Sequence, residues 1–218
     1  MPRIIDVLLS ILALLVLLPL FIPIIIILLL TGEHKVFFLQ KRVGFKNNNF
    51  KIIKFATMLS NSANIGSGSL TLKNDPRVLP FGSFLRRTKI NELPQILNII
   101  IGDLSIVGPR PQMEIDFKKY SDEVQKNIYN VRPGLTGIGS IIFRDEESLI
   151  SLAAENENPH DFYKRVIAPY KGELEIWYHS HRSIFLDFQL IFLTAWAIAY
   201  PETRLYEKWF KDLPKRSF

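Results

Sequence analysis

One uninterrupted apolar segment constrains this chain more than any other feature of its sequence. From Val7 to Leu30 there is no charged residue, and nearly every position is Leu, Ile, Val, Phe, Ala or Pro. A helix of that length would extend for about 36 Å, which is enough to cross the hydrocarbon core of a bilayer. The sequence therefore predicts a membrane segment at the N-terminal end of the chain.

Two questions about this segment stay open at the level of sequence. A cleavable signal peptide normally has a shorter apolar region, about 7–15 residues, so the length favours a retained anchor. Pro19 and Pro23 each remove a backbone donor and bend or break a helix. The residues alone fit a helix that bends and returns to the same membrane face as well as a bent helix that crosses the membrane.

The cysteine content and the charge distribution limit the cellular compartments and the partners that this chain can have. The 218 residues include no cysteine, which excludes disulfides and thiolate chemistry. The net charge is +6, and residues 32–60 carry six cations against one glutamate. Basic residues directly after an apolar segment favour the cytoplasmic side and suit anionic headgroups or phosphate-bearing substrates, although they also fit a solvated face. No nucleic-acid fold signature is present, so we expect no nucleic-acid partner.

The spacing of apolar and turn-forming residues predicts the elements that follow. Strands are expected at 36–39 and 50–55, a loop at 60–76, an extended segment at 131–143, and helices at 85–101, 116–129, 146–154 and 159–174, the last interrupted by Pro169. The apolar stretch 184–200 contains Asp187 and is short for a membrane span. It fits an interfacial helix and a core helix equally well.

The densest group of polar side chains lies between residues 85 and 95. Arg86 comes first, Asn91 is a good helix N-cap, and Pro94 would fall in the first turn of the helix. Glu92 would then lie at the positive end of a helix dipole, where phosphate also binds, and its carboxylate could hold Mg²⁺. The competing interpretation is an ordinary capped helix.

Two later turns each place a cation beside a restricted backbone. Gly108-Pro109-Arg110-Pro111 holds one guanidinium in a defined direction, and Arg132 precedes a second glycine-containing turn at 133–137. Arginine suits bidentate phosphate binding. Each turn also fits a rigid loop with a solvated arginine.

Taken in order behind the apolar segment, these motifs resemble the bacterial sugar transferase family, the monotopic phosphoglycosyl transferases that start glycan assembly on undecaprenyl phosphate. The resemblance covers nearly the whole chain and includes residues 37–44, 50–55, 74–77 and 102–105. It implies an α/β membrane-associated fold: an N-terminal re-entrant membrane helix broken at Pro19, a small mixed catalytic domain, and interfacial amphipathic helices. The expected parts are 1–31, 32–182 and 183–218.

The resemblance also implies a function. Such an enzyme transfers sugar 1-phosphate from a UDP-sugar to polyprenyl phosphate and releases UMP, with Mg²⁺, at the cytoplasmic face of the bacterial inner membrane. The product enters polysaccharide, O-antigen or glycoconjugate assembly, and downstream glycosyltransferases or a second copy are further expected partners. The expected site consists of Asn91 and Glu92 as the catalytic pair, Glu92 as metal ligand, and Lys54, Arg86, Arg110, Arg132 and Arg144 as phosphate-binding cations.

The sequence departs from the family pattern at the catalytic pair. Family members usually carry Asp-Glu there, and the Asp attacks the phosphate nearest the sugar to form a covalent intermediate. Asn91 occupies that position, and an amide is a far poorer nucleophile than a carboxylate. Ala56 replaces a frequent Arg, and residues 139–147 also differ from the family pattern.

These departures leave several hypotheses open. In an active enzyme the attacking group could be Glu92, Asp145 or Glu146, or the acceptor's own phosphate in direct in-line attack. The rival hypothesis is a catalytically impaired pseudoenzyme that binds nucleotide sugar or a partner glycosyltransferase at the membrane. The intact phosphate-binding pattern favours an active enzyme, and the sequence does not choose among its possible attacking groups.

Overall fold

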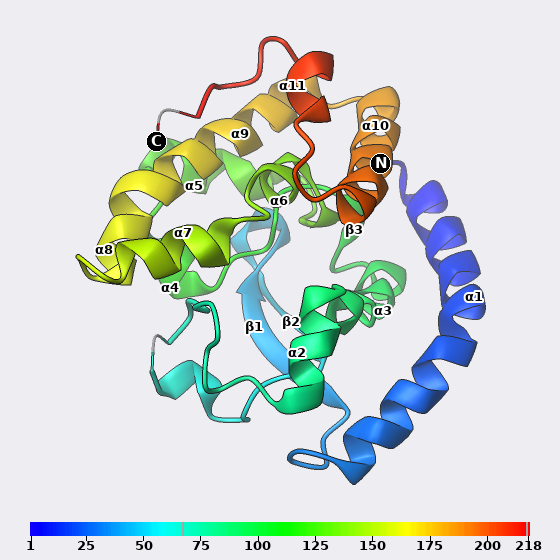
Figure 1. Ribbon diagram of the computed structural model, residues 1–218. Coiled ribbons are helices and arrows are strands. Elements are labelled where there is room, and N and C mark those ends of the chain that lie inside the picture. Colours follow the sequence, from blue (N-terminus) through cyan, green and yellow to red (C-terminus); the bar gives the residue numbers. More distant parts are fainter. Residues whose placement is uncertain (67, 217) are drawn as a thin grey trace.

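The protein has a mixed α/β fold with one long helix at its side (Figure 1). The computed structural model describes residues 1–66, 68–216 and 218. Strands β1 (Phe37–Val43) and β2 (Asn49–Phe55) form an antiparallel hairpin, and β3 (Ser105–Val107) and β4 (Gly134–Thr136) form a short parallel pair. The α-helices are α1 (Arg3–Leu30), α2 (Pro80–Arg87), α3 (Gln95–Ile101), α4 (Glu114–Phe117), α5 (Asp122–Asn127), α6 (Ile138–Ile142), α7 (Glu146–Ala153), α8 (Pro159–Phe162), α9 (Ala168–His181), α10 (Ile184–Ala199) and α11 (Leu205–Trp209).

Helix α1 is continuous through both of its prolines. Figure 1 shows it curving along one side of the domain. This corrects the prediction of a helix broken at Pro19. A proline removes one backbone hydrogen bond, so the helix bends and continues when packing holds the segments on both sides.

Both ends of α1 are fixed to the same domain. Near its start, the buried Asp6 carboxylate accepts hydrogen bonds from Ser105 Oγ at 2.8 Å and from the backbone N of Ile106 at 3.0 Å. Near its end, Phe21 and Leu28 pack in a small cluster with side chains of β2 and α2. The two ends of the apolar helix therefore lie against one body.

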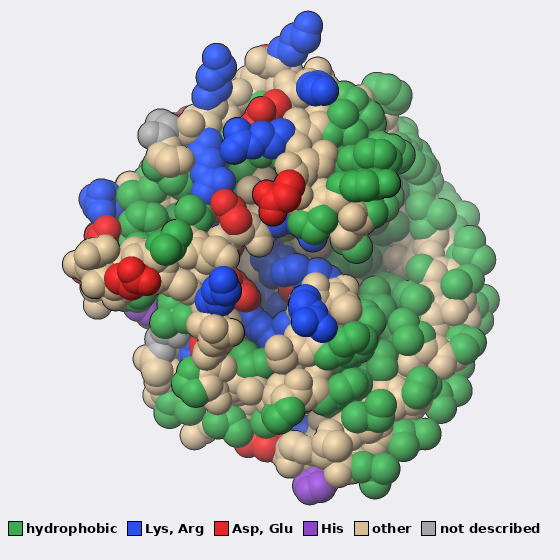
Figure 2. All heavy atoms as spheres, viewed as in Figure 1, with side chains coloured by type: hydrophobic (Ala, Val, Ile, Leu, Met, Phe, Trp, Pro, Cys, Tyr) green, Lys and Arg blue, Asp and Glu red, His purple; other side chains and the backbone are tan. Residues whose placement is uncertain are grey.

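The outer face of α1 is apolar and exposed. Its large exposed side chains include Ile4, Leu8, Leu12, Leu15, Val16, Ile22, Ile26 and Leu30. Figure 2 shows hydrophobic side chains covering this side of the molecule. Among the described residues, α1 alone is long and apolar enough to cross a membrane. Such a continuous apolar surface is typical of a membrane-contacting face.

Helix α10 packs against the core on one side and is exposed on the other. Leu190 and Leu193 are buried in the main core, whereas Phe185 and Phe192 on other faces are exposed. The internal acid that argued against a membrane span, Asp187, is buried and accepts a hydrogen bond from Tyr178 Oη at 2.7 Å. Location at a membrane interface remains a prediction for this helix.

The segment 85–101 differs from the single helix predicted for it. Lys89 adopts a left-handed backbone conformation with φ of 60°, which ends the helical path of α2. A short 3₁₀ turn, η3 (Ile90–Glu92), follows, and α3 starts only after Pro94. Asn91 is therefore inside the 3₁₀ turn and is not the N-cap of the long helix.

Three other segments also differ from their predictions. Residues 131–143 are extended only in β4, and α6 starts at Ile138. Segment 116–129 is divided between α4 and α5, because Ser121 caps the second helix. Pro169 lies in the first turn of α9, where its missing N–H is not needed; the irregular turn before it is a π-helical segment, Tyr163–Ile167.

One buried arginine organises the loop that follows the hairpin. The Arg77 guanidinium forms an ion pair with Asp75 at 2.5 Å and donates to the backbone oxygens of Ser62 at 2.7 Å and Leu70 at 2.7 Å. It also donates to the carbonyls of Ile65 and Gly68. These bonds connect residues on both sides of the loop, from Ser62 to Leu70, to a single side chain, so the Asn74–Arg77 motif has a structural role here.

Replacing this arginine should destabilise the protein strongly. Arg77→Ala leaves the buried Asp75 carboxylate and several loop carbonyls without their partner, so the free energy of unfolding should fall by about 3–5 kcal/mol. Thermal unfolding in detergent measures the effect. The matched control is Arg165→Ala, which removes an exposed pair with Glu157 and should cost less than about 1 kcal/mol. Equal shifts for the two variants would contradict the assignment.

Candidate functional site

A cleft of about 830 Å³ lies between the β-hairpin, the 62–77 loop, α2 and α7. We call it the basic cleft. Figure 2 shows Lys and Arg side chains gathered around a hollow at the centre of this face. Its lining cations are Arg42, Lys54, Lys73, Arg86, Arg87, Lys89, Arg110, Arg144 and Lys171, and its lining carboxylates are Asp75, Glu92, Asp116, Glu146 and Glu147.

Glu92 joins two cations at the centre of the cleft. Its Oε1 accepts a hydrogen bond from Arg110 Nη2 at 2.9 Å and from Lys54 Nζ at 3.2 Å. The three side chains come from η3, from the Gly108–Pro111 turn and from the end of β2. Burial alone would raise the pKa of Glu92, but the charges of Arg110 and Lys54 outweigh it and hold that pKa well below its ordinary value.

The cations respond to the same burial in different ways. Burial lowers the pKa of Lys54 to about 7, and the Glu92 charge offsets only part of that fall. Burial also lowers the pKa of Arg42 to about 10, with repulsion from Arg110 as the next cause. The charge of Glu92 raises the pKa of Arg110. The cleft thus holds several closely spaced cations and would gain from a ligand that carries negative charge.

Close backbone packing positions the Arg110 turn. A side chain at Gly108 would meet the Arg132 carbonyl oxygen at 2.4 Å, and one at Gly134 would meet the Gly108 backbone nitrogen at 2.1 Å. Tyr129 also holds the backbone of this turn, because its hydroxyl donates to the Arg110 carbonyl at 2.8 Å and accepts from the Gln112 backbone N at 2.9 Å. Gly108 and Gly134 therefore allow β3 and β4 to pack closely, and this packing positions Arg110.

The structure brings together most of the residues expected from the sequence. The predicted residues that line the basic cleft are Lys54, Arg86, Asn91, Glu92, Arg110, Arg144 and Glu146. Arg132 is not among the lining residues; its Nε donates to the Gly102 carbonyl at 3.0 Å and its guanidinium lies over the Phe45 ring. Asp145 also lies outside the lining and forms an ion pair with Arg216 at 3.1 Å.

Five cations that line the cleft were not among the predicted site residues: Arg42, Lys73, Arg87, Lys89 and Lys171. Arg42 is on β1. Because side chains alternate between the two faces of a strand, the predicted hairpin would have placed Arg42 on the face that carries Gln40 and Lys54. Lys171, on α9, pairs with Glu146 at 2.7 Å. No local sequence signal marks Lys171, because its position depends on the packing of α9 beside α7.

The acidic side chains that line the cleft all have cationic partners. Besides Glu92, Glu146 pairs with Lys171 at 2.7 Å and Glu147 with Arg86 at 2.5 Å. Asp116 pairs with Lys119 and Asp75 with Arg77. A carboxylate held in this way has its charge engaged and is a weaker nucleophile than a free one.

Asn91 differs from these acidic residues. It lines the cleft, it is 5% exposed, and its Oδ1 has no hydrogen-bond partner among the described residues. A buried acceptor without a partner costs free energy that a ligand donor can recover.

Sequence comparisons show the family to which this chain belongs. The family model described as "Bacterial sugar transferase" matches residues 1–200. The chain belongs to the bacterial sugar transferase family. A similar protein in this family is the exopolysaccharide production protein ExoY of Sinorhizobium fredii, which is 36% identical over 163 residues, covering 68% of this chain and 72% of the relative.

Other relatives of this sugar transferase carry names that state an acceptor. The undecaprenyl-phosphate glucose phosphotransferase of Komagataeibacter xylinus is 31% identical over 204 residues, covering 88% of this chain and 34% of the relative. An N-acetylgalactosaminephosphotransferase of Aeromonas hydrophila, also named for undecaprenyl phosphate, is 31% identical over 191 residues, covering 85% of this chain and 41% of the relative. The chain thus spans less than half the length of these two relatives.

The pKa of Lys54 gives a direct test of the site in the sugar transferase. Competitive acylation with acetic anhydride, read by mass spectrometry, should give Lys54 a reaction midpoint near pH 7, against about 10.4 for an ordinary lysine. Glu92→Gln should lower the midpoint further, because it removes the charge that stabilises the protonated amine. Between the lower pKa of Lys54 in the folded protein and its ordinary pKa in the unfolded chain, the amine is protonated only in the unfolded chain. The contribution of Lys54 to stability therefore rises with pH over this range. A midpoint near the ordinary value in the native protein would contradict the geometry.

Proposed function

We propose that this protein transfers a sugar 1-phosphate from a UDP-sugar to a polyprenyl phosphate and releases UMP, at the cytoplasmic face of the bacterial inner membrane. The observation that carries the proposal is the convergence of Arg110 and Lys54 on Glu92 in a basic cleft beside an exposed apolar helix. Relatives named as undecaprenyl-phosphate sugar phosphotransferases support the same reaction. The product would enter bacterial glycan assembly.

The cations of the cleft suit a diphosphate and an incoming phosphate together. Arg110 and Arg42 present guanidinium groups, which bind phosphate oxygens through paired N–H donors. Charge that spreads over the phosphate oxygens in the transition state is stabilised by such fixed donors. A bound diphosphate would also favour the protonated form of Lys54, since an added negative charge raises the pKa of a neighbouring amine.

The acceptor phosphate is the attacking group that the geometry favours. An oxygen of the polyprenyl phosphate attacks the phosphorus attached to the sugar, and the bond from that phosphorus to the bridging oxygen breaks. UMP leaves with the electron pair, so no protein group has to become covalently bound. The support is that Glu92 and Glu146 are ion-paired, Asp145 lies outside the cleft, and Asn91 has no carboxylate.

The residues present fit a magnesium ion that arrives with the substrate. No group of three or more His, Asp or Glu suited to a metal occurs in the part of the chain that the structure describes. Mg²⁺ is commonly bound by one or two carboxylates together with substrate phosphates and water, and Glu92 has a second carboxylate oxygen in addition to the one shared by Lys54 and Arg110. When bound, the ion would neutralise charge on the diphosphate.

A re-entrant arrangement of α1 is part of this proposal. The helix is fixed at Asp6 and at Leu28 to the same domain. A helix that crossed the membrane completely would leave one of these contact points on the far side. Entry and return on one face keep both contacts and leave the exposed apolar face in lipid.

Transfer can be measured with radiolabelled UDP-sugars and undecaprenyl phosphate, scoring label in butanol-extractable lipid. We expect a product with at least one sugar, and Arg110→Ala should reduce its rate by on the order of 100-fold. Arg132→Ala, the matched arginine outside the cleft, should remain close to wild type. No lipid product from any sugar tested, together with retained nucleotide-sugar binding, would favour the pseudoenzyme instead.

The same preparations distinguish the attacking group. Labelled UMP should not exchange into UDP-sugar when the acceptor lipid is absent, since exchange requires a phosphosugar held covalently on the enzyme. Exchange without lipid, with a phosphosugar adduct on Glu92 or Glu146 in intact mass spectra, would show that a protein carboxylate attacks.

The membrane arrangement of α1 can be tested with single cysteines, because the chain has none of its own. Pro2→Cys and Lys35→Cys place exposed thiols beyond the two ends of α1. In intact spheroplasts an impermeant maleimide should label neither variant, and after lysis it should label both. Labelling of Pro2→Cys alone before lysis would indicate a fully crossing helix.

A further inference from the structure

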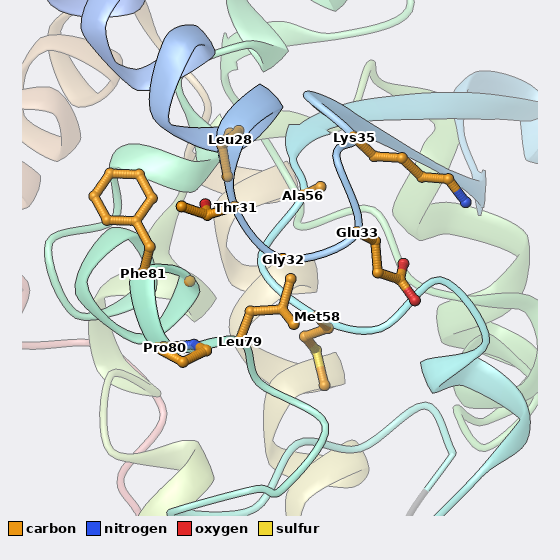
Figure 3. Close-up of a pocket in the computed structure, with 11 residues that line it drawn as sticks. Leu28, Thr31, Gly32, Glu33, Lys35, Ala56, Met58, Leu79, Pro80 and Phe81 are labelled. Atoms are coloured by element: carbon orange, nitrogen blue, oxygen red, sulfur yellow. The ribbon is translucent and has the colours of Figure 1, made fainter.

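An apolar pocket lies where α1 ends, outside the basic cleft. It has a volume of about 230 Å³. Its apolar walls are Leu28, Ala56, Met58, Leu79, Pro80 and Phe81. Figure 3 shows Leu28 and Leu79 projecting into the space from opposite sides, whereas Lys35 extends away from it. We call this space the apolar pocket.

The apolar pocket lies next to the basic cleft. Met58, Leu79 and Pro80 line both of them. Met58 also contacts a cleft cation, because its sulfur accepts from Arg86 Nη1 at 3.5 Å. These shared residues therefore place the two spaces side by side.

The β2 strand sets the spacing between the two spaces. Strand pairing continues one residue past Phe55, since the Ala56 backbone N donates to the Val36 carbonyl at 2.9 Å. Lys54 and Ala56 thus lie on the same face of an extended chain, about 7 Å apart. The residue that would bind a phosphate in the cleft and the residue that forms a wall of the apolar pocket are therefore two positions apart on one strand.

This arrangement fits a molecule in which an apolar group is joined directly to a phosphate. The diphosphate of a UDP-sugar is flanked on both sides by polar groups, uridine and sugar, which an apolar pocket would not favour. The acceptor of the proposed reaction carries an isoprenoid chain on its phosphate. We infer that the apolar pocket holds the first isoprenoid unit of the acceptor lipid and that the small side chain of Ala56 makes room for it.

The position of the pocket provides an exit for the rest of the lipid. Leu29 and Leu30, at the end of the apolar helix, are exposed beside the pocket rim at Thr31. Later isoprenoid units can pass from the rim into the hydrocarbon that surrounds this end of α1. This inference rests on the proposed function and assigns its acceptor subsite.

Filling the pocket should impair use of the acceptor alone. Ala56→Leu should raise the KM for undecaprenyl phosphate by roughly tenfold, the effect of a misplaced methylene group or two in an apolar pocket. The KM for the UDP-sugar, measured at saturating lipid, should stay within twofold of wild type. Initial rates over a matrix of both substrates, in detergent, give the two constants.

A second variant tests the same pocket independently, in case the first variant misfolds. Thr31 is exposed at the pocket rim, so Thr31→Phe should narrow the entrance without disturbing the core, and it should raise the same KM. The matched control is Leu15→Phe, which places the same ring on the exposed apolar face of α1, at a position that does not line the pocket. It should leave the acceptor KM unchanged.

The outcomes separate this inference from the proposed function. If the wild type is active and both pocket variants keep its acceptor KM, the subsite assignment is wrong and the proposed reaction stands. If the pocket variants lose activity while their acceptor KM equals that of the wild type, and added phospholipid restores that activity fully, the pocket binds a bilayer lipid and the inference is also wrong. If the wild type transfers nothing to any prenyl phosphate, the proposed function itself fails.

Discussion

A single carboxylate shared by two cations is the interaction on which this structure depends. Glu92 holds Arg110 and Lys54 within 3.2 Å of one oxygen. Like charges at this separation would repel one another in a partly buried site, and the carboxylate allows them to be held together before any substrate arrives. A ligand phosphate then meets cations that are already in place, which reduces the entropy lost on binding.

The β-hairpin connects this chemistry to the membrane segment. Along β2, Phe55 points to α1, where its ring meets Phe21 edge to face with centroids 5.3 Å apart. The neighbouring Lys54 points to the cleft. Because successive strand residues face opposite sides, one short strand contacts the apolar helix α1 on one side and contributes Lys54 to the basic cleft on the other.

Much of this arrangement was accessible from sequence, and the exceptions have physical causes. Local rules of periodicity and turn chemistry predicted the long apolar helix, the hairpin, and Glu92 and Arg110 as candidate residues. The fold class and the role of Lys54 came from the family resemblance, and most of the other cleft residues were not predicted. The break at Lys89 could not be predicted, because a left-handed non-glycine residue is stabilised by its surroundings and not by its type. Arg132 and Lys171 illustrate the other limit: only tertiary packing decides which cation faces a cleft.

The buried Asp6 carboxylate also sets an order of events during synthesis. Its partner Ile106 comes 100 residues later in the chain. At bacterial elongation rates the ribosome needs roughly 5–20 seconds to reach that point. Throughout that interval the Asp6 carboxylate lacks its two native partners, so the native contacts at the start of α1 form only after the β3 segment has left the ribosome.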